Sequence, residues 1–230
     1  MNKITNNLEM INKEVLKHAS KVNREPQNII ILGVSKKQSI ETISKGIEAG
    51  IINFGENYIN EAVNKIDTIN NKNLSWHFIG HLQSNKARFA VKYFDLIHTV
   101  DTIKLAIEID KQAQKINKKQ EILIQVNISE EQSKSGIVAQ DACLLAKNIS
   151  ALTNLKLKGV MGMPPFSNNP ENSRKYFINL KRIKDSIEEL NIPSVEMIHL
   201  SMGMSHDFGI AIEEGSTIIR IGTKLFGQRQ

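Results

Sequence analysis

The amino-acid sequence predicts an α/β fold: a (β/α)8 TIM barrel built as a single domain over residues 1–230, with an extra N-terminal helix. Two patterns predict it. Apolar runs rich in β-branched residues recur along the chain, and segments with helical periodicity separate them. Such alternation indicates parallel strands joined by crossover helices, and eight units within about 200 residues match a small barrel. An open doubly wound sheet is the alternative, although that fold usually carries fewer strands.

Eight apolar runs are the predicted strands. In chain order they are "IIILGVS" from 29, "IINFG" from 51, "LSWHFIG" from 74, "LIHTV" from 96, "EILIQVNIS" from 121, "LKLKGVMG" from 155, "SVEMIHLS" from 194 and "STIIRIG" from 216. Helices are predicted over 39–50, 102–116 and 173–190, and Ser39 and Thr102 stand at N-cap positions. Segment 4–22 is predicted to be the extra helix, outside the barrel. No Pro, Gly and Ser-rich linker marks a second domain.

Composition excludes several classes of protein. The single cysteine, Cys143, excludes an intramolecular disulfide and a multi-thiol metal site. No apolar run approaches the roughly 18 residues that cross a bilayer, and the N-terminus lacks a signal-peptide pattern, so we expect a cytoplasmic protein without a membrane partner. The net charge is +6, but the lysines are spread along the chain and aromatic residues make up only 5%. We therefore expect no nucleic-acid partner.

The loops that follow the strands of a parallel barrel share one face, where its chemistry concentrates. Two of these loops predict an anion site. The stretch "SMGMSHDFGIAIEEG" from 201 places a glycine and two serines before a helix, with Ser205 as the N-cap. The "IGT" after the last strand adds Gly222 and Thr223, and barrels often bind phosphate with these two loops. An ordinary helix cap with a tight turn is the alternative interpretation.

Two basic side chains complete the predicted site. A lysine at the barrel mouth is partly desolvated, which favours the neutral amine that forms a Schiff base. Lys36 and Lys37 both qualify, and strand parity alone does not choose between them. Arg220, on the inner face of the last strand, would donate a hydrogen bond to a pyridine nitrogen and keep it unprotonated. A lysine, a phosphate site and this arginine together indicate the cofactor pyridoxal 5'-phosphate. With an arginine at its pyridine nitrogen, this cofactor is only a weak electron sink.

Longer stretches carry a resemblance to a known family. They are "VSK" at 34–36, "FGENY" at 54–58, "WHFIGHLQSNK" at 76–86, "VNIS" at 126–129, "KSGI" at 134–137, "SMGMSHDF" at 201–208 and "RIGTKLFG" at 220–227. Along nearly its whole length the sequence resembles the single-domain pyridoxal phosphate homeostasis proteins, which are related to the barrel domain of alanine racemase. The resemblance implies that Lys36 carries the cofactor as a Schiff base. It also implies the other cofactor contacts: Ser205, Gly222 and Thr223 at the phosphate, Arg220 at the pyridine nitrogen and Asn57 nearby.

The resemblance implies a protein that buffers pyridoxal phosphate and delivers it to apo-enzymes without catalysis, and we expect a monomer. The alternative is an amino-acid racemase or another amino-acid-transforming enzyme. Racemisation by two bases needs an acid or base on each face of the substrate. The resemblance implies that in alanine racemase the second base is a tyrosine from another domain of a partner subunit. This sequence predicts no such domain, and Tyr93 and Tyr176 are expected on helices. Tyr58 or a histidine is then left as the candidate second base.

A third class, a phosphosugar barrel enzyme, needs paired carboxylates or a metal triad at the mouth, and the sequence shows neither. His77 and His81 have the i, i+4 spacing that binds a metal when it lies on a helix. Here the two residues span a strand end and its loop, so we expect no metal.

Overall fold

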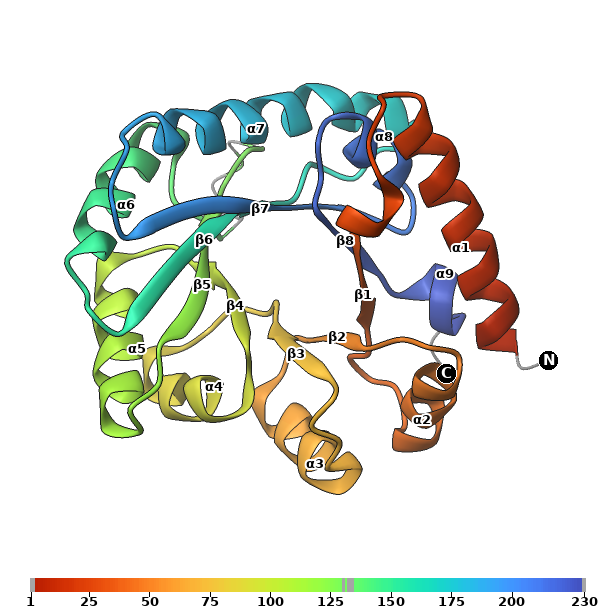
Figure 1. Cartoon of the computed structure of the whole chain (residues 1–230), viewed down its shortest axis with the longest axis horizontal. Helices are drawn as coiled ribbons and strands as arrows, with labels where there is room; N and C mark the ends of the chain where they lie inside the picture. Colours follow the sequence, from red (N-terminus) through yellow and green to blue (C-terminus); the bar gives the residue numbers. More distant parts are fainter. Residues whose placement is uncertain (1–2, 130, 132–134, 229–230) are drawn as a thin grey trace.

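The computed structural model describes residues 3–129, 131 and 135–228, and it is a closed barrel of parallel strands ringed by helices (Figure 1). Each strand pairs with the next along the chain, and β8 pairs with β1. The strands are β1 Ile30–Val34, β2 Asn53–Glu56, β3 Ser75–Phe78, β4 Leu96–Val100, β5 Gln120–Val126, β6 Leu155–Gly162, β7 Val195–Met204 and β8 Ile218–Ile221. The predicted (β/α)8 fold is confirmed, and each predicted run overlaps its strand.

Helices alternate with the strands as predicted, and one more helix precedes the first strand. They are α1 Lys3–Ser20, α2 Ile40–Glu48, α3 Ile59–Ile69, α4 Ala87–Tyr93, α5 Ile103–Lys115, α6 Ala142–Ser150, α7 Arg174–Glu188, α8 Phe208–Glu213 and α9 Thr223–Phe226. Both predicted caps form, because the Ser39 hydroxyl accepts from the amide of Thr42 (3.1 Å) and the Thr102 hydroxyl from that of Leu105 (3.3 Å). Short 3-10 helices lie at Pro26–Asn28, Ser84–Lys86, Ala139–Asp141 and Pro170–Ser173.

The predicted N-terminal helix takes the place of the eighth helix of the ring. The helix that follows β8, α9, has only four residues, and α1 packs beside α8 and α9 (Figure 1). The buried side of α1 carries Ile4, Ile11, Val15 and Ala19. Polar bonds fix its position: the Asn7 side-chain amide donates to the Leu225 carbonyl (2.8 Å), and Lys224 pairs with Glu14 (2.6 Å). The helix therefore closes the ring over the last strand.

Strand alternation divides the core into two parts. Outward-facing side chains, such as Ile219 and Ile221 of β8, pack between the strands and the helices. Inward-facing side chains fill the barrel with a smaller apolar cluster, formed by Leu32, Leu96, Leu123, Met161 and Ile218. The inner alternation of β1 continues through Val34 to Lys36, and that of β8 from Ile218 through Arg220 to Gly222. Both strands thus lead from the apolar interior to the same end of the barrel.

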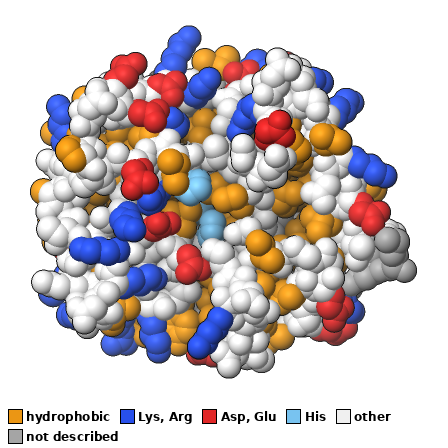
Figure 2. Space-filling model, viewed as in Figure 1, with side chains coloured by type: hydrophobic (Ala, Val, Ile, Leu, Met, Phe, Trp, Pro, Cys, Tyr) orange, Lys and Arg blue, Asp and Glu red, His pale blue; other side chains and the backbone are white. Residues whose placement is uncertain are grey.

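The surface mixes charges of both signs. Figure 2 shows Lys, Arg, Asp and Glu side chains interspersed around one face, with hydrophobic and histidine side chains at its centre. Within the described ranges, no helix is both long and apolar enough to span a bilayer.

Candidate functional site

All six predicted site residues line one cavity of about 250 Å³, where the strands end. They come from four strands and the loops after them. Lys36 follows β1, Asn57 follows β2 and Ser205 follows β7, whereas Arg220 lies on β8 and is followed by Gly222 and Thr223. The remaining lining side chains are mostly apolar: Val34, Ile79, Met163, Phe166, Met204 and His206. A barrel of parallel strands brings together residues that are up to 187 positions apart in the sequence, from Lys36 to Thr223 (223 − 36).

Lys36 and Lys37 point to different surroundings. Lys36 keeps the inward parity of Leu32 and Val34, is half-buried and lines the cavity. Lys37 is exposed and adopts a left-handed backbone conformation, with φ of 60°, which turns the chain away from the strand direction. The cavity therefore receives the first lysine and not the second.

Arg220 places a buried cation in this cavity. Its Nη1 donates to the Ser201 hydroxyl (2.8 Å) and its Nη2 to the Gly162 carbonyl (3.0 Å). Burial lowers the pKa of Arg220 to about 10, so the guanidinium remains protonated at neutral pH. The described residues that line the cavity include no carboxylate. The site is consequently suited to an anionic ligand.

The loops after β7 and β8 are bonded to each other. The amide of Lys224 donates to the Ser205 hydroxyl (3.3 Å), so Ser205 lies beside the turn that carries Gly222 and Thr223. This is the arrangement expected of a phosphate site made by these two loops.

The prediction that Ser205 caps the following helix is wrong. Strand β7 continues to Met204, and α8 begins only at Phe208, with Asp207 at the N-cap position. The Asp207 carboxylate accepts from the Met204 amide (2.7 Å) and from the Ser173 hydroxyl (3.0 Å). Gly203 permits this path, because its φ is +91° and a Cβ there would lie 2.5 Å from the Cβ of Ala211.

Ser201 also differs from the prediction, which placed it in the anion site. It is a fully buried residue of β7, and its hydroxyl contacts Arg220 and His98. It therefore supports the arginine from inside the barrel and does not line the cavity.

Asn57 offers an acceptor to a ligand. Its side-chain Oδ1 is buried and has no hydrogen-bond partner among the described residues. The backbone at Asn57 is held close to the next strand, since a Cβ at Gly80 would lie 2.1 Å from the Asn57 carbonyl oxygen. A buried acceptor without a partner is costly, so a donor supplied by a bound molecule would satisfy it.

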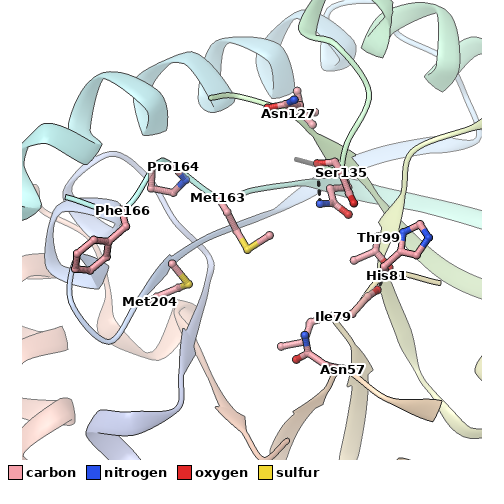
Figure 3. Close-up of a pocket in the computed structure, with 13 residues that line it drawn as sticks. Asn57, Ile79, His81, Thr99, Asn127, Ser135, Met163, Pro164, Phe166 and Met204 are labelled. Atoms are coloured by element: carbon pink, nitrogen blue, oxygen red, sulfur yellow. Dashed lines mark hydrogen bonds between the residues drawn. The ribbon is translucent and has the colours of Figure 1, made fainter. Parts of the chain in front are cut away.

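A second cavity of about 360 Å³ adjoins the first and shares Asn57, Ile79, Met163, Phe166 and Met204 with it. Figure 3 shows Met163 and Met204 between Phe166 on one side and Asn57 and His81 on the other. Neutral polar side chains, Thr99, Gln125, Asn127 and Ser135, line its far wall. Lys134, in the "KSGI" stretch, lies outside the described residues. The two cavities are therefore neighbours at the barrel mouth.

The sequence reasoning missed the side chains that hold Arg220. Ser201 contacts His98 (Oγ to Nδ1, 3.0 Å), and His98 contacts His77 (Nε2 to Nδ1, 3.0 Å). Burial lowers the pKa of His77 to about 3 and that of His98 well below its usual range, so both rings are neutral. A signal was available, because His98 interrupts the apolar run "LIHTV" at a position that faces the interior. Across the described ranges, no group of three or more His, Cys, Asp or Glu could hold a metal ion.

Comparisons with known proteins agree with this geometry. Residues 8–230 match the family model described as "Alanine racemase, N-terminal domain". The fold and the site thus define a barrel of the alanine racemase type.

The relatives narrow this class. The pyridoxal phosphate homeostasis protein of Aquifex aeolicus (strain VF5) is 40% identical over 224 residues, which cover 97% of each chain. The chain therefore belongs to the pyridoxal phosphate homeostasis protein family. A Bifidobacterium adolescentis crystal structure has a TM-score of 0.92 at 29% identity and covers 98% of this chain and 97% of its own. PipY of Synechococcus elongatus PCC7942, solved with pyridoxal phosphate bound, has a TM-score of 0.84 at 31% identity, covering 98% and 100%.

Proposed function

We propose that this protein binds pyridoxal 5'-phosphate and serves in its homeostasis, holding the cofactor and delivering it to apo-enzymes without catalysing amino-acid chemistry. The observation that carries the proposal is the single cavity shared by Lys36, Arg220 and the two loops after β7 and β8. The relatives support it, since one is named a pyridoxal phosphate homeostasis protein and PipY was solved with the cofactor. The proposal includes a monomeric, cytoplasmic protein in which residues 1–230 form one cofactor-binding domain.

The residues present fit this cofactor. When bound, pyridoxal phosphate supplies an aldehyde, which condenses with an amine as a carbon–nitrogen double bond forms and water leaves. Lys36 would provide that amine. Ser205, Gly222 and Thr223 would hold the phosphate with hydroxyl and backbone donors, and Asn57 would offer its buried acceptor to the cofactor's polar groups.

Arg220 favours a protein that carries the cofactor over an enzyme that uses it for catalysis. Its guanidinium can only donate, and Ser201 and Gly162 hold it in place from inside the barrel. A donor facing the pyridine nitrogen keeps that nitrogen unprotonated, which weakens the cofactor as an electron sink. The chain would then bind the cofactor firmly without activating it for amino-acid chemistry.

Borohydride reduction tests the covalent attachment. We expect the cofactor-bound protein to be yellow, with near-visible absorbance. Reduction should abolish this absorbance and leave the cofactor on a peptide that contains Lys36. Lys36→Ala should lose the reducible cofactor, while Lys37→Ala, its neighbour outside the cavity, should retain it. The opposite result in the two variants would reassign the site.

A second candidate function, amino-acid transformation, is favoured by the adjoining cavity, which leaves room for a substrate beside the cofactor. Tyr58 is half exposed and next in sequence to Asn57, whereas Tyr93 and Tyr176 lie on helices α4 and α7, as predicted. Deuterium incorporation at Cα of L-amino acids in heavy water separates the two functions. Exchange at about 1 per second or faster, lost in Lys36→Ala, would establish an enzyme. Background exchange, with transfer of cofactor to an apo-enzyme, would support the carrier.

A further inference from the structure

A buried ion cluster lies directly behind the cofactor lysine, on the side of β1 away from the cavity. Lys65, on α3, is only 4% exposed in its side chain. Its Nζ donates to Glu56 (2.7 Å), to Glu61 (2.5 Å) and to the Ser35 carbonyl (2.7 Å). Glu56, the last residue of β2, is fully buried. All three protons of the ammonium group are thus directed to acceptors within the cluster.

The cluster holds the main chain on each side of Lys36. Before it, the Ser35 carbonyl accepts from Lys65, and the Ser35 hydroxyl donates to Glu56 (2.7 Å). After it, the Lys37 amide donates to Glu61 (2.5 Å). The left-handed conformation of Lys37, costly for a residue with a Cβ, is therefore held by a charged acceptor.

Stability alone does not account for ions at this position. Desolvation of a buried ion pair offsets much of its attraction, and apolar side chains of similar volume are often equally stabilising or better. Burial raises the pKa of Glu56, which shows the cost of this placement. What the ions provide, and apolar side chains cannot, is a set of directed bonds to the peptide groups that flank Lys36.

We infer that Lys65, held by Glu56 and Glu61, is a positioning residue that orients Lys36 for covalent attachment of the cofactor. It acts through the Ser35 and Lys37 peptide groups and does not line the cavity. A strand end fixed in this way loses less conformational freedom when the cofactor attaches. The inference rests on the proposed function, because it assumes that Lys36 bonds to pyridoxal phosphate.

Comparing the binding of two ligands distinguishes positioning of the Lys36 amine from general stabilisation of the fold. Pyridoxal 5'-phosphate bonds to the lysine, whereas pyridoxine 5'-phosphate has an alcohol in place of the aldehyde and binds only through its ring and phosphate. In Lys65→Met we expect affinity for pyridoxal phosphate to fall about tenfold, the equivalent of about 1.4 kcal/mol, with pyridoxine phosphate changed less than about twofold. The matched control is Lys45→Met, since Lys45 makes an i, i+4 pair with Glu41 on the exposed side of α2.

A second pair of variants keeps the test independent of Lys65, in case its loss prevents folding. Glu61 is 26% exposed, so its replacement is tolerable. Glu61→Ala removes the acceptor for Lys37 and should weaken pyridoxal phosphate selectively, whereas Glu61→Gln keeps an acceptor oxygen and should restore most of the affinity. Glu41→Ala is the control.

The inference would be overturned if the folded Glu61→Ala and Lys65→Met proteins lost affinity for both ligands equally, or lost none. The proposed function would stand in either case. Failure of the unmodified protein to bind pyridoxal phosphate would overturn the proposed function, and the inference with it.

Discussion

A buried cation in a cavity whose described lining includes no carboxylate is the main chemical feature of the site. The described lining residues include Arg220 and Lys36 but no acid. Arg220 is oriented by two acceptors, a serine hydroxyl and a main-chain carbonyl, neither of which neutralises its charge. Asp207 acts on Arg220 through charge, but burial has the larger effect on its pKa, and an anionic molecule in the cavity would offset more of that cost. At the scale of single residues, these features support the proposal that the cavity binds a phosphorylated ligand.

The hydroxyls of Ser205 and Thr223 should make the protein bind pyridoxal phosphate more tightly than pyridoxal. Replacing either with Ala should weaken pyridoxal phosphate by about 1.5–3 kcal/mol, the range for a hydrogen bond to a charged group. Binding of pyridoxal, which lacks the phosphate, should hardly change. Titration of both ligands against each variant measures the difference, with Thr68→Ala, an exposed hydroxyl on α3, as the control. Equal losses for the two ligands would show that these loops do not hold the phosphate.

Residue identities were more predictable than residue roles. The six cavity residues follow from which strand ends meet, and strand alternation with the family resemblance selects them. The role of Ser205 as a cap was not predictable, because β7 continues to Met204 through the left-handed Gly203 and shortens the helix that follows. Lys65 was detectable in principle: with Ile59 and Ala62 it falls on the buried side of a helical pattern, where a lysine needs partners.

At the scale of elements, α1 connects the N-terminal segment to the site. It packs against α9, whose first residue is Thr223. Asn7 and Glu14 bond to Leu225 and Lys224 within α9. Because the short α9 has little stability of its own, the position of the turn at Gly222 and Thr223 depends on the helix that covers it.

Removing the apolar contact of α1 should destabilise the protein and loosen this loop. Ile11 is fully buried, so Ile11→Ala should lower the free energy of unfolding by about 2–5 kcal/mol. Met10, next to it, is 56% exposed, and Met10→Ala should change stability by less than about 0.5 kcal/mol. Urea denaturation compares the two variants. A similar, small effect in both would mean that α1 is not part of the cooperative fold.

The elements themselves were largely visible in the sequence. The runs at 96–100 and 155–162 coincide with β4 and β6, because buried parallel strands are rich in apolar residues even where single polar residues interrupt them. The helix over 4–22 was predicted, but its place in the ring was not. That place depends on α9 being too short to cover β8, which is a property of the closed barrel and not of any local pattern.

At the scale of the whole molecule, a hydrogen-bonded chain crosses the barrel interior from the site. It runs from Arg220 through Ser201, His98 and His77 to Ser75, which donates to Asp95 (3.2 Å). The donor-to-acceptor direction of every hydrogen bond in this chain is fixed by the two end groups, since an arginine only donates and a carboxylate only accepts. Each histidine then carries its proton on Nε2 and accepts at Nδ1. Protonation of either ring would reverse a bond in the chain.

Stability should therefore fall in mild acid. His77 has a pKa of about 3 in the folded protein, and the pKa of His98 is also well below the ordinary 6.5, so the unfolded chain binds more protons below pH 6.5. Each ring then contributes a loss of about 1.4 kcal/mol per pH unit below about pH 6, or roughly 2.7 for both.

Other groups also affect the pH dependence, and His199, whose own pKa burial lowers, adds to the loss. The Arg220 charge and His199 both disfavour protonation of His98, whereas Glu56, with its raised pKa, opposes the trend by binding its proton more readily when folded. Urea denaturation at pH 7, 6 and 5 measures the slope above the range where ordinary carboxylates titrate. His98→Gln should lower the slope between pH 6 and 5 by about 1.4 kcal/mol per pH unit, while His81→Gln, an exposed histidine, should leave it unchanged. An unaltered slope in His98→Gln would show that the buried ring does not control the acid sensitivity.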